Sequence, residues 1–124
     1  MGGSRFDRSR RLLTAAEFRQ VFAAPKRSTD HLFTVLTRGS REGNARLGLA
    51  ISRKLVRRAV DRNRIKRLVR ESFRQHQVQL KGLDVVVLAR RETAGADNRQ
   101  LLLSLQAHWQ RLARASLTSG PETR

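Results

Sequence analysis

The sequence contains no cysteine, which excludes disulfide bonds and thiolate metal sites. Aromatic residues make up only 5% of its 124 residues, so the core must consist mainly of aliphatic side chains. No apolar run approaches the roughly 20 residues of a membrane span, and the N-terminus lacks the apolar segment of a secretory signal. The length fits one domain, and we expect a cytoplasmic protein that contacts no membrane.

Acidic residues are also scarce. The chain has 27 Lys and Arg against 10 Asp and Glu, a net charge of +17. A compact domain with this charge repels itself unless a polyanion neutralises it, and solubility alone requires a net charge of only about 2 to 8. The charge therefore predicts binding to a nucleic acid.

The N-terminal half predicts a helix followed by strands. Thr14 and Glu17 have the spacing of a capping box, and an apolar stripe follows them to a stop at Pro25. The runs 32–37 and 46–52 have strand patterns and flank a turn cluster, so we expect them to pair as a hairpin. The second run has a face of small residues, Gly48, Ala50 and Ser52, against which either a helix or a ligand strand could pack.

The C-terminal half predicts helix, strand, helix. The first helix spans about 55–76, and the continuous apolar run 84–89 is typical of a strand buried on both faces. Asp97 is the expected N-cap of the last helix, and Phe33 and Trp109 are assigned to the core. The predicted class is α+β, with a flexible basic arm (1–11), one RNA-binding domain (12–115) and a disordered tail (116–124).

The helix at 55–76 has two faces. Its apolar stripe consists of Ile65, Leu68, Val69, Ser72 and Phe73. A second stripe is cationic apart from one amide: Asn63, Lys66, Arg67, Arg70 and Arg74. Residues 53–74 hold ten basic and two acidic residues, Asp61 and Glu71, and like charges four residues apart destabilise a free helix. Contact with phosphates reverses that cost through counterion release.

The surrounding sequence favours RNA over DNA. No leucine zipper follows the basic helix, and a predicted strand rather than a helix precedes it, which argues against a helix-turn-helix. A ribosomal or ribosome-assembly protein remains the main alternative, and a DNA-binding regulator is a weaker one. A protein nuclease is the least supported, because the acids are scattered and His31, His76 and His108 have no ligand spacing. For each histidine we expect a surface or strand-end role, and no catalytic or metal-binding residue.

Residues 45–74, ARLGLAISRKLVRRAVDRNRIKRLVRESFR, resemble the bacterial ribonuclease P protein family, whose "RNR" signature matches 62–64. The segments 11–22 and 84–90 also fit, so the resemblance covers about residues 10–115. It implies a single-domain αβββαβα sandwich with a small central sheet and a left-handed β-α-β crossover. It also implies a subunit that assists removal of the 5′ leader of precursor tRNA, with no obligate protein partner. The chemistry would belong to the RNA subunit and its Mg²⁺, with no cofactor on the protein.

The resemblance implies two contact surfaces. The surface for the RNA subunit comprises Arg57, Arg58, Arg62, Asn63, Arg64, Lys66, Arg67 and Arg70. The surface for the precursor-tRNA leader comprises Phe18, Phe22, Ser52, Arg53, Lys54 and Arg90. Exposed aromatics beside cations make a stacking groove for a single strand, although aromatics at helical spacing are more often core. Asp61 is expected to cap or pair locally.

Overall fold

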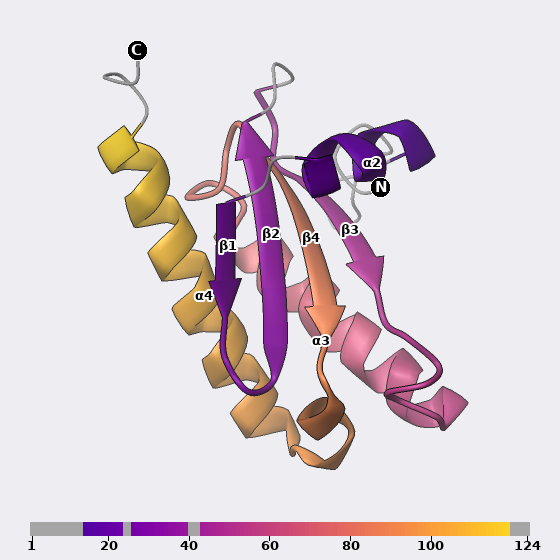
Figure 1. Cartoon of the computed structure of the whole chain (residues 1–124). Helices are drawn as coiled ribbons and strands as arrows, with labels where there is room; N and C mark the ends of the chain where they lie inside the picture. Colours follow the sequence, from indigo (N-terminus) through magenta and orange to yellow (C-terminus); the bar gives the residue numbers. More distant parts are fainter. Residues whose placement is uncertain (1–13, 24–25, 40–42, 120–124) are drawn as a thin grey trace, which may run out of the picture.

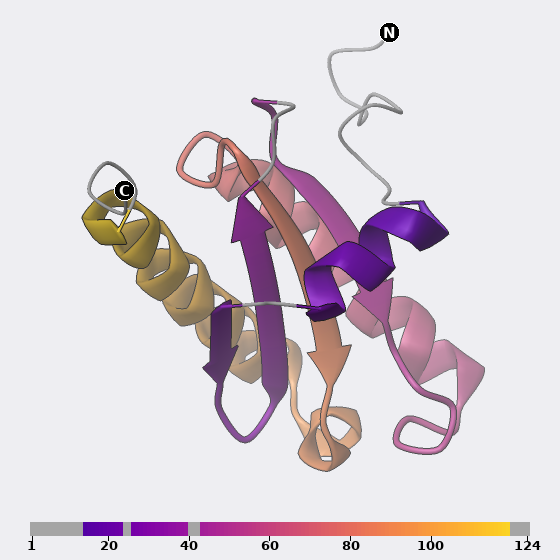
Figure 2. The same ribbon diagram turned by 45° about the horizontal axis from the view of Figure 1, so that its top comes forward.

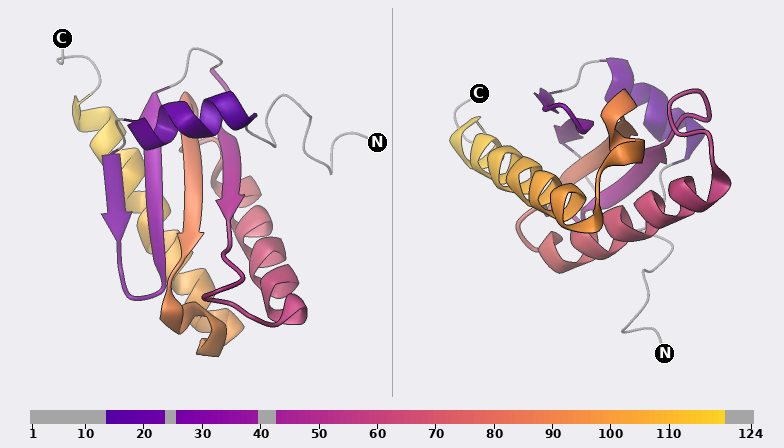
Figure 3. Two further views of the ribbon diagram at one scale, coloured as in Figure 1. Left: turned by 45° about the vertical axis from the view of Figure 1, so that its right-hand side comes forward. Right: turned by 90° about the horizontal axis from the view of Figure 1, so that it is seen from below.

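The computed structural model describes residues 14–23, 26–39 and 43–119. The elements follow in the order α2 (Ala15–Ala23), β1 (Lys26–Thr29), β2 (Phe33–Gly39), β3 (Arg46–Ala50), α3 (Ala59–His76), β4 (Leu83–Ala89), a 3₁₀ turn η2 (Arg91–Gly95) and α4 (Asn98–Ser119). Four strands form one sheet, with α3 and α4 on one face and α2 across the other (Figures 1 and 3). The expected α+β sandwich is confirmed.

The strand order β1-β2-β4-β3 corrects the predicted hairpin. β2 and β3 are separated by β4, which pairs antiparallel with β2 and parallel with β3. The actual hairpin joins β1 to β2. A continuous apolar strand such as β4 must be covered on both edges and both faces, and placing it between β2 and β3 achieves this.

The β3-α3-β4 unit crosses over with the left hand that the family resemblance implies. In Figure 1 both strands point down, α3 lies behind the sheet and β4 lies to the left of β3. Most parallel crossovers have the opposite hand. No sequence pattern specifies this exception.

The main core lies between the sheet and the two long helices. Phe33, Phe73 and Trp109 are fully buried in it, as predicted for Phe33 and Trp109. The indole Nε1 of Trp109 donates to Ser72 Oγ over 2.8 Å, so the buried Ser72 hydroxyl of the α3 stripe has a partner. A smaller cluster, Val21, Leu36 and Val86, packs α2 on the opposite face.

The helix ends follow the predicted caps. Thr14 and Glu17 exchange backbone and side-chain hydrogen bonds, as do Asp97 and Gln100. α3 begins at Ala59 rather than near residue 55, and α4 continues to Ser119, beyond the predicted start of the tail at 116. The predicted arm 1–11, the stop at Pro25 and residues 120–124 lie outside the described residues.

Candidate RNA-binding surfaces

The exposed face of α3 is a cationic surface. Ile65, Val69 and Phe73 are fully buried, so the helix is fixed with its second stripe outward. Asn63, Arg67 and Arg70 on that stripe are exposed, and Lys66 is half-buried. This is the arrangement that phosphate binding requires, because the guanidinium groups are held on a rigid element without being covered by it.

Two arginines of the "RNR" motif are engaged within the protein. Arg62 Nη1 donates to the carbonyls of Val56, at 3.0 Å, and Arg57, at 2.8 Å. Arg64 Nη1 donates to Asn98 Oδ1 at 2.8 Å, and its Nη2 lies 3.9 Å from Asp61. The two arginines therefore fasten α3 to the preceding loop and to the start of α4.

Asp61 pairs locally, as predicted. Its carboxylate lies 4.0 Å from Arg58 and 3.9 Å from Arg64. Arg58 and Arg57 themselves are exposed on the loop that leads into α3, and they extend the cationic surface toward β3. Exposed cations therefore lie both on the loop and along the first half of α3.

The loop between β3 and α3 is a compact turn. Ser52 Oγ accepts from the Lys54 amide at 3.1 Å, and its carbonyl accepts from the Val56 amide at 2.9 Å. Arg53 and Lys54 are exposed at its tip. Fully buried Val56 anchors the loop to the core, so these cations are carried by an ordered support.

On the other face of the sheet, strand register defines successive rows of side chains. Arg38, Asp84 and Arg46 form one row. Leu36, Val86 and Gly48 form the next, and α2 lies over these two rows. A third row, Thr29, Thr34, Leu88 and Ala50, lies beyond it. Figures 1 and 2 show α2 across one end of the sheet; no other helix formed by the described residues lies over that face.

Phe18 explains one of the small residues in β3. An added Cβ at Gly48 would lie 2.6 Å from Phe18 Cζ, so the ring rests directly on the glycine backbone. Of the two options for the small-residue face, a packed helix is therefore correct at Gly48. Phe18 is half-buried, and its ring stacks at 6.4 Å on that of Phe22, which is 47% exposed.

A groove of about 630 Å³ occupies the uncovered part of this face. Two of the predicted leader residues, Phe22 and Arg90, line this groove. Arg27 and Arg91, two cations that the sequence did not indicate, line it as well. The other lining residues are Thr34, Leu36, Leu55, Leu88, Ala89 and Glu92. The predicted leader residues Phe18, Ser52, Arg53 and Lys54 do not line it, although Leu55 from the same loop does.

The position of Arg27 in the groove follows from the pairing register of β1 with β2, which the sequence does not specify. The segment KRST has no apolar alternation that would predict a strand. It pairs with β2 so that Ser28 faces the core, and Arg27, opposite Leu36, faces the groove. The missed residue thus depended on a strand held by tertiary contacts rather than by its own propensity.

A cluster of three charged groups lies beneath α2. Arg46 donates from Nε to Asp84 Oδ1 at 2.8 Å and from Nη2 to Oδ2 at 3.0 Å, and its Nη1 donates to Glu17 Oε2. Hydrogen bonding to Asp84 raises the pKa of Arg46 above its usual value. The Thr14 amide, and to a smaller extent Arg46, lowers the pKa of Glu17. Both groups are therefore charged at neutral pH.

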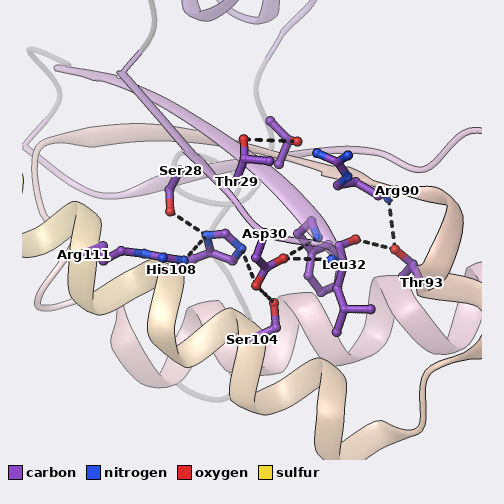
Figure 4. A network of polar contacts seen from close by, with 11 residues as sticks. Ser28, Thr29, Asp30, Leu32, Arg90, Thr93, Ser104, His108 and Arg111 are labelled. Carbon is purple, nitrogen blue, oxygen red and sulfur yellow. Dashed lines mark hydrogen bonds and ion pairs between the residues drawn. The ribbon is translucent and has the colours of Figure 1, made fainter.

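A polar network under β1 corrects the expectation for one histidine (Figure 4). His108 is fully buried on α4, where its Nδ1 lies 2.7 Å from Ser28 Oγ and its Nε2 lies 3.2 Å from Asp30 Oδ2. Burial lowers its pKa, so it is neutral at neutral pH. Asp30 also accepts from Ser104 and from two backbone amides, so the network ties the β1–β2 turn to α4. His31 is exposed, as expected.

Within residues 14–23, 26–39 and 43–119, no group of three or more His, Cys, Asp or Glu side chains could hold a metal ion. None of the helices described there is long and apolar enough to cross a membrane. Among the described residues, the two surfaces present mainly cations, with the exposed ring of Phe22 and the single acid Glu92 in the lining of the groove. They are suited to binding a polyanion.

Comparison with known proteins decides the family. The model of the ribonuclease P family matches residues 6–113. The chain belongs to the ribonuclease P protein family. It is 52% identical to the ribonuclease P protein component of Methylococcus capsulatus over 90% of this chain and 88% of that one. It is 46% identical to that of Escherichia coli over 94% and 96%.

Solved ribonuclease P proteins have the same fold. The Staphylococcus aureus protein superposes with a TM-score of 0.74 at 32% identity, covering 83% of this chain and 94% of that one. The Thermotoga maritima protein gives 0.69 at 31% identity, covering 77% and 90%. As a member of the family, the chain is the protein subunit of the tRNA-processing ribonuclease P holoenzyme, and membership implies association with ribonuclease P RNA.

Proposed function

We propose that this subunit binds the catalytic RNA through α3 and its preceding loop, and the 5′ leader of precursor tRNA in the groove beside α2. The RNA-binding surface consists of Arg57, Arg58, Asn63, Lys66, Arg67 and Arg70. Arg62 and Arg64 contribute mainly by holding α3 and the loop in place, because their guanidinium groups already donate to protein oxygens.

The groove is the observation that supports leader binding. Its floor is uncharged, with Thr34 and Leu88, and its walls carry Phe22, Arg27 and Arg90. An exposed ring can stack on a base of any identity, and arginines can follow the phosphates. Ser52, Arg53 and Lys54 extend this cationic path toward α3, and Phe18 supports the exposed ring from behind. A single strand fits this surface better than a duplex does.

The subunit supplies binding and charge screening, while the RNA supplies the chemistry. Mg²⁺ in the holoenzyme is then held by RNA phosphates, which are the oxygen ligands that this ion prefers. The protein lowers the Mg²⁺ requirement because its cations replace part of the counterion atmosphere. The proposed location is the cytoplasm, where precursor tRNA is processed.

Substitution of Phe22 tests the groove. In the assembled holoenzyme, Phe22→Ala should weaken the binding of precursor tRNA by about five- to 150-fold, the range of a lost base stack, and leave the binding of mature tRNA unchanged. Phe22 is half exposed, so stability should change little, and thermal unfolding checks this. Val78→Ala is the matched control, since Val78 is 76% exposed and does not line the groove. Equal weakening of both tRNAs by Phe22→Ala would refute the assignment.

A further inference from the structure

Helix α2 has little apolar packing to fix its position on the sheet. It is 9 residues long, and Val21 is its one buried residue. Helices this short are marginal in water without tertiary support. The half-buried ring of Phe18 adds a second apolar contact, on Gly48 and against the cluster of Val21, Leu36 and Val86. Apolar burial alone therefore leaves the direction of the helix axis weakly determined.

The Glu17–Arg46–Asp84 cluster supplies directional contacts that the apolar packing lacks. Arg46 and Asp84 are register partners on β3 and β4, and two guanidinium nitrogens bind both Asp84 oxygens. This fork fixes the plane of the guanidinium group. The third nitrogen, Nη1, donates to Glu17 on α2. The Arg46 and Asp84 side chains are 12% and 4% exposed, so water competes little for these bonds.

Glu17 couples this cluster to the helix start. One carboxylate oxygen accepts from the Thr14 amide at 2.7 Å in the capping box, and the other accepts from Arg46. The first turn of α2 is therefore attached to the sheet by the polar side chain of Glu17 as well as by the ring of Phe18. Phe18 follows it directly, and Phe22 lies one turn further on the same face.

We infer that Glu17 and Arg46 are positioning residues for substrate binding: they hold α2 so that Phe22 stands at the wall of the groove. The inference rests on the proposed leader-binding function of that groove. Neither residue lines the groove, so each acts through the placement of α2 rather than by contact with RNA.

Glu17→Gln tests the inference with little risk to the fold. The amide can still accept from Thr14, and the Arg46–Asp84 fork remains complete, so the sheet keeps its buried ion pair. Removing an acid should by itself strengthen RNA binding through charge. The positioning role predicts instead that binding of the leader becomes weaker. The direction of the change therefore distinguishes the two effects.

Michaelis parameters and tRNA affinities of the assembled holoenzyme provide the readout. We expect Glu17→Gln to raise the KM for precursor tRNA at constant kcat. The ratio of precursor to mature tRNA affinity should fall by about three- to tenfold, because only part of the lost charge-assisted hydrogen bond reaches the groove. Glu71→Gln is the matched control: it makes the same charge change on exposed α3, and should affect both tRNAs equally. An unchanged affinity ratio in Glu17→Gln would overturn the inference.

Amide hydrogen exchange separates this inference from the proposed function. Faster exchange in α2 of Glu17→Gln reports the loosened helix without any RNA. If Phe22→Ala lowers the ratio of precursor to mature tRNA affinity and Glu17→Gln does not, the positioning role is refuted and leader binding in the groove stands. If Phe22→Ala has no effect although α2 exchanges faster in Glu17→Gln, then leader binding in the groove is refuted, and with it the role inferred from it.

Discussion

Gly48→Ala tests whether the contact between Phe18 and β3 fixes α2. The new methyl would lie 2.6 Å from Cζ of Phe18 and 3.0 and 3.1 Å from its two Cε atoms. Carbon atoms pack at about 3.5–4.0 Å, so the ring must retreat by roughly 1 Å. Because the clashing atoms are the end of a side chain on α2, the ring yields by turning or by moving with the helix, and the sheet does not move.

The magnitude follows from two opposing terms. Overpacking costs about 1–3 kcal/mol. Replacing a strand glycine lowers the entropy of the unfolded chain and returns about 0.4–1 kcal/mol. The net loss is about 1–2 kcal/mol in the free energy of unfolding, or about 4–8 °C in Tm. In a Phe18→Ala background the clash is absent, and Gly48→Ala should be neutral or slightly stabilising.

Urea unfolding followed by fluorescence of Trp109 measures this double-mutant cycle. Trp109 is the one tryptophan of the chain and is fully buried, so its emission reports global unfolding. We expect a coupling free energy of about 1–3 kcal/mol between positions 18 and 48. Equal destabilisation by Gly48→Ala in both backgrounds would refute the account of α2 packing. Ala50→Gly, in the neighbouring row, serves as a control that should show no coupling to Phe18.

Three further predictions concern the networks and the cationic surface. Burial acts to raise the pKa of Asp30, but hydrogen bonds from Ser104 and two backbone amides lower it to about 2 from 3.8. The stability from Asp30 is therefore complete above about pH 4 and is lost, by about 2 kcal/mol, as pH falls toward 2. The pKa of His108 is lowered by burial, so the unfolded chain takes up a proton at this position before the folded protein does. Acidification below the unfolded value near 6.5 therefore also lowers the free energy of unfolding. Urea unfolding across pH 2–8 measures both effects. Arg67→Glu with Arg70→Glu should weaken RNA-subunit binding and flatten its log–log salt slope by about 1.5. Arg62→Met should cost about 1–2 kcal/mol by removing two carbonyl partners, and limited trypsin digestion should then cut the 53–58 loop faster.

Each of these has a contrary result. If the stability of Asp30→Asn falls below pH 4 as steeply as that of the parent protein, the loss does not come from protonation of Asp30. A salt slope that does not change on double charge reversal would place the RNA subunit elsewhere. Trypsin cleavage at an unchanged rate in Arg62→Met would mean that the loop is held without the guanidinium.

Local patterns predicted the elements but not every pairing. The capping boxes at Thr14 and Asp97 and the apolar stripe of α3 are determined by nearby residues, and all are present. The hairpin prediction was wrong because sequence proximity suggested that 32–37 and 46–52 pair. The strongest apolar strand, β4, takes the place between them, and that choice depends on burial across the whole sheet.

In the candidate site, too, the sequence predicted the features that nearby residues determine and missed those that depend on tertiary contacts. The cations of α3 were predictable because their exposure is set by the apolar stripe of the same helix. Arg27 and Arg91 were missed because only the register of β1 and the η2 turn bring them to the groove. Similarly, His108 looked isolated in the sequence, because two of its partners, Ser28 and Asp30, lie about 80 positions away.

The most direct test of the central claim is cleavage of a precursor tRNA at low Mg²⁺ by the cognate ribonuclease P RNA, with and without this protein. We expect the protein to restore 5′-leader removal that the RNA alone does not sustain, and Phe22→Ala to raise the KM for this reaction. If the protein binds the RNA and leaves cleavage unchanged, its proposed role in leader binding is contradicted.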